Sequence, residues 1–306
     1  MRNAERGTGA LRSRHPRNSA EKPVDPSLLI VSWSTDITPV CPDPAPCVHE
    51  RVVLPVLPTR SIFLWPGARH TVEVMSDITM ITGANKGIGR ETARRLKEAG
   101  HTVIIGARDV ERGRAAADEL GVGFVQLDVT GQESVDAAAA HVRAEHGRLD
   151  VLINNAGITG TFSPIEQTVV DDAQAVLDTN LFGVMRVTNA FVPLLELSDH
   201  ARIVNISSGV SSFQDTIENG YFDWNIIPPV YAMSKTALNM LTLKYSRALP
   251  TMRVNAADPG YTRTDLNGGA GAHDVTEGTD EIVRLATIAA DGPTGTISNS
   301  QGVLRW

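Results

Sequence analysis

Short apolar runs alternate with helical stretches from Asp77 to the end of the chain, and few folds accept this pattern. Seven runs have the length and residue types of strands: Ile78–Thr82, Thr102–Gly106, Gly123–Leu127, Asp150–Asn154, Arg202–Ile206, Met252–Ala256 and Thr294–Ser298. Six stretches between them are amphipathic or alanine-rich, as helices are: Gly89–Ala99, Val110–Leu120, Gln132–His146, Val170–Leu195, Pro229–Leu249 and Val275–Ala289. Strands that alternate with helices indicate βαβ units and a parallel sheet. We therefore predict one Rossmann-type α/β domain over residues 75–306, doubly wound around a seven-stranded parallel sheet.

Residues 1–74 lack this alternation. Ten of the 17 prolines lie there, and proline interrupts helices and central strands because it has no N–H and a fixed φ. We expect a disordered, proline-rich extension ahead of the domain. It is either dispensable, for instance sequence upstream of a true start at Met75, or a tail for targeting or for binding a partner.

The charge of the chain argues against several classes of partner. The net charge is −7, and residues 75–306 hold 19 Lys and Arg against 28 Asp and Glu, whereas nucleic acids and anionic membranes attract a basic face. No apolar run approaches the ~20 residues that cross a bilayer. Cys41, Cys47 and His49 provide three metal ligands without a fourth. We expect a cytoplasmic protein that binds a small molecule, with no nucleic acid, membrane or metal partner.

A glycine-rich turn follows the first predicted strand directly. It reads Thr82-Gly83-Ala84-Asn85-Lys86-Gly87-Ile88-Gly89 and leads into a helix. Glycines accept positive φ and let a pyrophosphate approach the backbone, and the start of a helix offers free N–H groups and a positive dipole end. The turn predicts a dinucleotide site, with a turn that binds no ligand as the alternative.

A tyrosine and a lysine share one face of the fifth helix expected in chain order. Tyr231 and Lys235 are four residues apart, one helical turn. A fixed ammonium stabilises a phenolate, so we expect Lys235 to lower the pKa of Tyr231 toward neutrality. The phenol could then donate and accept protons.

Two serines follow the strand Arg202–Ile206, at the edge of the sheet where open α/β folds bind ligands. A hydroxyl there can hydrogen bond a substrate oxygen as charge develops on it. Ser207 and Ser208 are both candidates from position alone, and a capping or turn role for either is the alternative.

The spacing T-G-x-x-x-G-x-G, with Y-x-x-x-K downstream, resembles the short-chain dehydrogenase/reductase family, and the resemblance covers residues 75–306. It implies that Tyr231 is the catalytic acid and base and that Lys235 also reaches the nicotinamide ribose. It further implies that Ser208, with Ser207 as the fallback, binds the substrate oxygen. Asn180, inside the expected helix Val170–Leu195, matches the residue that completes a proton relay to Lys235.

The resemblance also implies the remaining contacts to a nicotinamide dinucleotide. Asp128 would hydrogen bond the adenine, although a cap of the following turn is the alternative for this residue. The residues implied to line the cofactor are Gly83, Asn85, Lys86, Gly87, Ile88, Gly89, Arg108, Asp128, Val129, Asn155, Ala156, Gly157, Tyr231, Lys235, Pro259, Gly260, Thr262 and Thr264. The glycine-rich segment Leu266–Ala272 would form a flap over the substrate.

The end of the second strand indicates which cofactor is used. An NAD enzyme of this family carries a carboxylate there for the ribose 2′-hydroxyl, and this chain has Ala107. Arg108 follows, and Lys86 lies in the glycine-rich turn. A guanidinium fork and an ammonium can both meet a 2′-phosphate. We therefore predict NADP(H).

An insertion separates the catalytic serine from the catalytic tyrosine. Ser208 and Tyr231 are 23 positions apart, more than in short members of the family. Tyr221 lies closer to Ser208 but has Asn225, not a lysine, four residues on, so we retain Tyr231. We expect an enlarged substrate-side loop, Val210–Pro228. Its aromatic residues would form pocket walls: Phe213, Tyr221, Phe222 and Trp224.

These features predict NADPH-dependent reduction of a ketone or aldehyde, or the reverse oxidation of an alcohol, with Tyr231 as the acid and base. The insertion, the N-K-G-I-G turn and the A-R-D strand end are similar to the monomeric carbonyl reductases of the family, which favours a monomer. Aromatic walls favour a bulky apolar carbonyl compound, such as a quinone. An epimerase or dehydratase on the same scaffold is one alternative, because the fold does not fix the reaction. A non-catalytic NADP-sensing regulator is the other.

Overall fold

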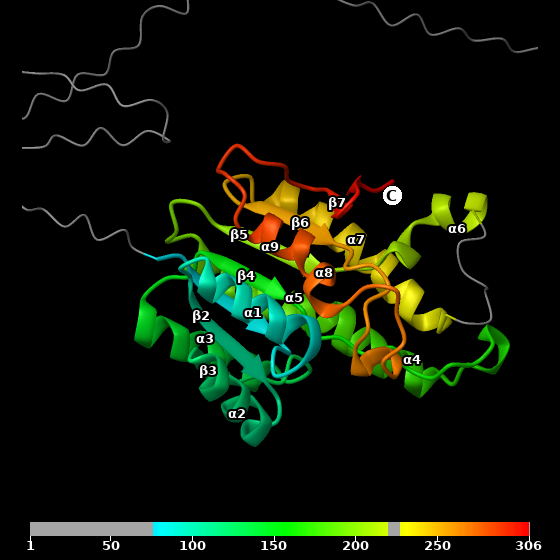
Figure 1. Cartoon of the computed structure of the whole chain (residues 1–306), viewed down its shortest axis with the longest axis horizontal. Helices are drawn as coiled ribbons and strands as arrows, with labels where there is room; N and C mark the ends of the chain where they lie inside the picture. The colour runs from blue at the N-terminus through cyan, green and yellow to red at the C-terminus, as the bar shows by residue number, and fades with distance from the viewer. Residues whose placement is uncertain (1–75, 220–226, 306) are drawn as a thin grey trace, which may run out of the picture. The chain divides into compact units, whose positions relative to one another are not determined.

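The central element of the molecule is an eight-stranded sheet in the order β3-β2-β1-β4-β5-β6-β7-β8 (Figure 1). The computed structural model describes residues 76–219 and 227–305. The strands are β1 Ile78–Thr82, β2 Thr102–Ala107, β3 Gly123–Gln126, β4 Val151–Asn154, β5 Arg202–Ile206, β6 Arg253–Ala257, β7 Ile297–Asn299 and β8 Gly302–Val303. Strands β1 to β7 pair in parallel, and β8 pairs antiparallel with β7.

Helices cover both faces of this sheet. They are α1 Gly87–Glu98, α2 Val110–Leu120, α3 Gln132–His146, α4 Val170–Leu177, α5 Gly183–Leu195, α6 Phe213–Asn219, α7 Pro229–Ala248, α8 Val275–Gly278 and α9 Asp280–Ala286. The helices α3 and α5 share one buried cluster with the sheet, and α1, α2 and α9 share a second cluster. The layers are therefore helix, sheet, helix, as in a doubly wound fold.

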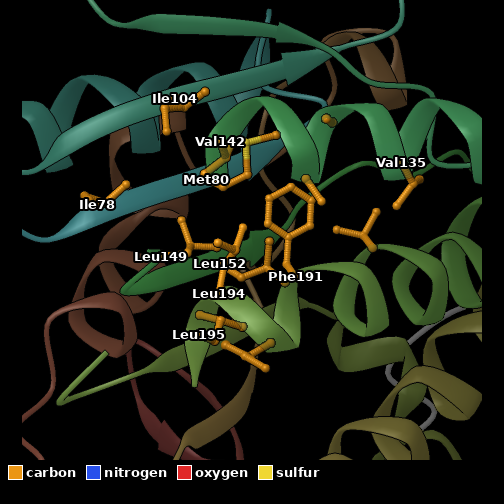
Figure 2. Close-up of a cluster of buried hydrophobic side chains, with 14 of the residues drawn as sticks. Ile78, Met80, Ile104, Val135, Val142, Leu149, Leu152, Phe191, Leu194 and Leu195 are labelled. Atoms are coloured by element: carbon orange, nitrogen blue, oxygen red, sulfur yellow. The ribbon is translucent and has the colours of Figure 1, made fainter. Parts of the chain in front are cut away.

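The strands are buried on both faces because their side chains alternate between the two clusters. In β4, Leu152 lies in the first cluster with Phe191, whereas Val151 and Ile153 lie in the second. Figure 2 shows Phe191 of α5 among the side chains of the sheet in the first cluster. Near-continuous apolar strands of this kind are typical of parallel sheets covered by helices.

The predicted Rossmann-type fold is confirmed, with a short antiparallel β8 added at the edge. The helix expected over Val170–Leu195 is interrupted by a π-helical turn, Asp178–Phe182. The helix expected over Val275–Ala289 divides into α8 and α9 at Thr279, which has a φ of −99° and a ψ of −4°. The expected loop Val210–Pro228 contains helix α6.

Several expectations concern residues that the structure does not describe. The proline-rich extension over residues 1–74, with Cys41, Cys47 and His49, lies outside the described residues, as does Tyr221 with the neighbouring aromatic residues of the insertion. Within 76–219 and 227–305, no helix is both long and apolar enough to span a membrane. In the same ranges, no group of three His, Cys, Asp or Glu side chains could hold a metal ion.

The strand order reverses between β1 and β4. The chain proceeds outward from β1 to β2 and β3, and outward on the other side from β4 to β7. Loops after β1 and β4 therefore diverge, which is where open α/β sheets bind ligands. The segments that follow β1, β4, β5 and β6 all begin at this edge.

Candidate active site

The glycine-rich turn packs directly against the loop that follows β4. A Cβ atom on Gly89 would lie 2.5 Å from Asn155 Nδ2, and one on Gly83 would lie 2.8 Å from Ala156 Cα. The hydroxyl of Thr82 accepts hydrogen bonds from the backbone N–H groups of Asn155 and Ala156, each at 3.0 Å. Gly83 also has a φ of +64°. Only glycine allows this close approach, so the glycine-rich turn and the loop after β4 pack into one continuous surface.

The start of α1 has the properties of an anion site. Lys86 occupies the N-cap position of α1 and has an extended backbone, but its side chain makes no capping hydrogen bond. No acidic residue lies in the first turn of the helix. The first N–H groups of a helix without a cap can bind phosphate oxygens. The Lys86 ammonium is exposed and lies 3.1 Å from the carboxylate of Asp265.

The end of β2 presents a cation and no carboxylate to the same edge. Ala107 is the last residue of the strand and is buried, and Arg108 after it is exposed. The nearest acid in sequence, Asp109, accepts a hydrogen bond from Arg112 N–H at 3.0 Å and so caps α2. The end of β2 therefore carries an exposed positive charge and no carboxylate on its last residue.

Asp128, expected at the adenine, and Val129, expected to line the cofactor, both have structural partners. Asp128 Oδ1 accepts hydrogen bonds from the Thr130 N–H at 3.0 Å and hydroxyl at 2.7 Å, so the turn role that was the alternative is present. Burial opposes ionisation, but these bonds and the charge of Arg108 hold the pKa of Asp128 below its ordinary value. The side chain of Val129 is buried in the first core cluster and packs against Gly183.

Helix α7 brings Tyr231 and Lys235 to the carboxyl edge beside Ser208. Lys235 Nζ lies 5.5 Å from the centre of the Tyr231 ring, and the Tyr231 phenol is hydrogen-bonded to the Ser208 side chain. Ser207 points elsewhere, because its hydroxyl donates to Asn239 Oδ1 at 2.6 Å in the core. Successive residues of an extended chain face opposite sides, which separates the two serines.

Asn180 lies in the π-helical turn between α4 and α5 and is buried. Its Nδ2 donates to the Ile158 carbonyl at 2.8 Å and to Ser234 Oγ at 3.0 Å, and its Oδ1 accepts from Ile158 N–H at 2.9 Å. A Cβ on Gly157 would lie 3.4 Å from Asn180 Oδ1 and 3.8 Å from Lys235 Nζ. The structure therefore brings Asn180, Gly157 and Lys235 together. Turns of π-helix are often found at functional sites.

The pKa of Tyr231 differs from the one expected from the sequence. Burial raises the pKa of Tyr231 to about 12, the Ser208 hydrogen bond lowers it in part, and the charge of Asp258 raises it further. Burial lowers the pKa of Lys235 to about 8. The expected fall of the Tyr231 pKa toward neutrality is not found in this structure, because burial of the phenol has the largest effect on it. Lys235 Nζ donates at 2.6 Å to the carbonyl of Ile206.

The buried ammonium of Lys235 should reduce the stability of the protein in a pH-dependent way. Its folded pKa, about 8, lies below the ordinary value of 10.5, so the cost of burial is fully present below about pH 8 and disappears as the pH rises toward 10.5. Lys235→Met should therefore gain about 2–3 kcal/mol more in the free energy of unfolding at pH 7 than at pH 10, relative to wild type. Urea denaturation at both pH values measures this difference.

The control is Lys244→Met, which replaces an exposed lysine of the same helix. Its effect on unfolding should be the same at the two pH values. An equal effect of Lys235→Met at both would show that the buried ammonium carries no such cost.

The segment after β6 lies beside the glycine-rich turn. Gly260 has a φ of +67°, and the Thr262 hydroxyl donates to the Pro259 carbonyl at 2.8 Å. Thr264 forms a capping box with Asn267 at the start of a short 3-10 turn. A Cβ on Gly87 would lie 3.6 Å from Thr264 Cγ2. The two predicted cofactor-binding segments thus meet, although they are far apart in sequence.

Two residues at this edge were not singled out by the sequence analysis. Ser234 accepts from Asn180 and donates to the Tyr231 carbonyl at 2.7 Å, and its position inside the Y-x-x-x-K motif gave no separate signal. Asp258 is a buried carboxylate directly after β6. Asp258, like Asp128, follows the carboxyl end of an apolar strand, and this position is the signal that could have identified it.

Proteins with similar sequences and structures are known. A family model of the short chain dehydrogenases matches residues 77–274. The short-chain dehydrogenase anuI of Penicillium roqueforti (strain FM164) is 36% identical over 229 residues, which covers 70% of this chain and 90% of that protein. The structure of salutaridine reductase from Papaver somniferum is 28% identical, with a TM-score of 0.64 and coverage of 72% and 99%. An NADPH-bound carbonyl reductase from chicken fatty liver is 29% identical, with a TM-score of 0.67 and coverage of 76% and 99%.

Proposed function

Because the chain belongs to the short-chain dehydrogenase family of oxidoreductases, we propose that it reduces a ketone or aldehyde with NADPH and that Tyr231 donates the proton. The observation that carries this proposal is the hydrogen bond between the Tyr231 phenol and Ser208. It lies on the sheet edge that also holds the glycine-rich turn and Lys235. Carbonyl reduction requires a proton donor, a second hydroxyl that binds the substrate oxygen, and a surface that binds the dinucleotide.

The residues around the glycine-rich turn fit NADP(H). The uncapped start of α1 would hold the pyrophosphate, and Arg108 and Lys86 would meet the 2′-phosphate, with no acid at Ala107 to oppose it. When bound, NADPH supplies the hydride for the carbonyl carbon. The carbonyl reductase from chicken fatty liver, a similar structure, was solved with NADPH.

The protein residues supply hydrogen bonds and the proton. In this proposal, the Ser208 hydroxyl donates to the carbonyl oxygen of the substrate and stabilises the charge that develops on it. Tyr231 then gives its phenol proton to that oxygen. Lys235, mostly charged at pH 7 with a pKa of about 8, lies beside the ring and favours the negative charge that the phenol acquires. Asn180 holds the Ile158 backbone and Ser234 in place next to Lys235.

The pKa of Tyr231 fits the role of proton donor. With a pKa of about 12, the phenol is almost fully protonated at neutral pH and is ready to donate. Oxidation of an alcohol needs the phenolate instead, whose fraction at pH 7 is about 10⁻⁵. The reverse reaction should therefore accelerate as the pH rises.

The rim of the site favours an apolar substrate. Large apolar side chains are exposed on the segments that follow β4, β5 and β6 at the carboxyl edge: Phe162, Ile165, Phe213, Ile217, Tyr261 and Leu266. Exposed apolar side chains on the segments that border a binding site favour an apolar ligand. We propose a bulky apolar ketone or aldehyde.

A panel of carbonyl compounds tests the proposal. NADPH absorbance should fall with at least one bulky apolar ketone, aldehyde or quinone, and the product should be the corresponding alcohol or hydroquinone. NADH should be used less well, with a higher KM. Isomerisation or dehydration without net loss of NADPH would indicate a different reaction on the same scaffold. A KM for NADH equal to or lower than that for NADPH would refute the cofactor assignment.

A further inference from the structure

One buried carboxylate joins three segments at the carboxyl edge of the sheet. Asp258 is 7% exposed. It accepts hydrogen bonds from the backbone N–H of Gly260 at 3.0 Å, from the backbone N–H of Gly209 and from the side chain of Asn299. These donors follow or end three neighbouring strands, β5, β6 and β7, whose adjacency is visible in Figure 1.

The contact with Gly209 is close. A Cβ atom on Gly209 would lie 3.2 Å from Asp258 Oδ2, which is tighter than an ordinary contact. Gly209 follows Ser208 directly, so the carboxylate reaches the turn that presents the Ser208 hydroxyl to Tyr231. The backbone N–H of Ser207 meanwhile donates to the Ala257 carbonyl at 2.8 Å. Asp258 thus adds a second attachment between this turn and the end of β6.

We propose that Asp258 is a positioning residue, whose buried carboxylate fixes the turn that carries Ser208 and places a negative charge within electrostatic reach of the Tyr231 phenol. The proposal rests on the proposed function in that Tyr231 is taken as the proton donor. The charge of Asp258 disfavours the phenolate. It therefore keeps Tyr231 in the protonated form, which is the form that donates in the reduction.

Other ionisable groups face this carboxylate or its neighbours. His273 is half-exposed, lies beside Gly260 and lowers the pKa of Asp258, whereas burial, the larger effect, raises it. Lys235 faces the Tyr231 ring from α7. Glu281 of α9 bonds the hydroxyl of Ser298, whose carbonyl accepts the Asp258 N–H at 2.8 Å. Buried carboxylates are costly unless hydrogen-bonded, and the three donors to Asp258 provide that compensation.

The attachment can be tested on the wild-type protein. In a sample labelled with ¹⁵N-glycine, the amide signals of Gly209 and Gly260 should shift together with pH, with one common pKa above the ordinary value of 3.8 for Asp. Both donate to the same carboxylate, and both should lose a charged acceptor when it is protonated. Glycine signals that titrate separately, or not at all, would overturn the proposed attachment. This measurement needs no variant and no turnover.

The charge effect is tested with Asp258→Asn, which keeps the shape of the side chain. Phenolate absorbance is titrated in wild type and in the variant, each with and without Tyr231→Phe, and the difference isolates Tyr231. Its pKa should fall by about one unit when the nearby charge is removed, and alcohol oxidation at a fixed alkaline pH should rise up to about tenfold. Circular dichroism establishes that each protein stays folded.

The matched control is Asp291→Asn, which removes the same charge from an exposed site away from this edge. It should leave the Tyr231 titration unchanged. A folded Asp258→Asn protein with an unchanged or higher Tyr231 pKa would refute the charge effect, and if that variant fails to fold, the glycine titration decides the attachment. Since neither titration requires a substrate, a chain that reduces no carbonyl would refute the proposed function without obscuring this result.

Discussion

Tyr231→Phe is expected to lower kcat for carbonyl reduction by at least about 1000-fold, within the range that removal of a general acid produces. The variant keeps the ring, which lies 5.5 Å from Lys235 Nζ, and loses only the hydroxyl that bonds Ser208. Folding and NADPH binding should therefore be preserved. Steady-state kinetics give the loss of kcat, and fluorescence titration with NADPH gives the Kd, which should stay within about twofold of wild type.

The control for this experiment is the other tyrosine of the region. Tyr221 has no lysine one helical turn on, so Tyr221→Phe should leave kcat largely intact. The opposite pattern, with Tyr221→Phe inactive and Tyr231→Phe active, would overturn the assignment of the proton donor. Loss of NADPH binding in Tyr231→Phe would show that the variant had damaged the cofactor site.

Ala107→Asp is expected to lower kcat/KM for NADPH about 100-fold and to raise it for NADH. A new carboxylate at the end of β2 would face the dianionic 2′-phosphate, and a like-charge contact of this kind costs several kcal/mol, where each 1.4 kcal/mol is a factor of ten. In NADH the same carboxylate could accept hydrogen bonds from the ribose hydroxyls. The ratio of kcat/KM for the two cofactors measures the effect.

Ala107→Asn separates the effect of charge from that of size. Ala107 is buried, so any larger side chain disturbs its surroundings, and the asparagine variant carries that cost without the charge. It should keep a preference for NADPH. If both variants lower NADPH use equally, the effect is steric and the electrostatic argument for the cofactor fails.

The fold was largely predictable because its signals are local. A strand buried on both faces needs a short apolar run, and the boundaries of β1, β5, α2 and α3 agree with the predicted ones. The exceptions have tertiary causes. The π-helical turn divides the expected long helix where Asn180 bonds Ile158 and Ser234, residues 22 and 54 positions away, and no helical periodicity reports such contacts.

The residues of the site could be predicted from the sequence, but their hydrogen-bond partners and pKa values could be predicted less well. The motifs identified Tyr231, Lys235 and two adjacent serines, of which the family resemblance favoured Ser208 with Ser207 as the fallback. Packing of Ser207 against Asn239 leaves Ser208 with the phenol. The direction of the Tyr231 pKa was predicted from a single neighbour, and the structure shows that burial outweighs it.

The order of residues along the chain was enough to establish the parallel sheet, the glycine-rich turn and the edge at which the motifs lie. The reason is that backbone conformation, apolar strand runs and amphipathic helix faces follow from neighbours in sequence. Folding in three dimensions decided which serine meets the phenol, how strongly Tyr231 holds its proton and that Asp258 joins the ends of three strands. These properties depend on burial, charge and hydrogen bonds between segments that are distant along the chain. Sequence spacing does not encode such distances.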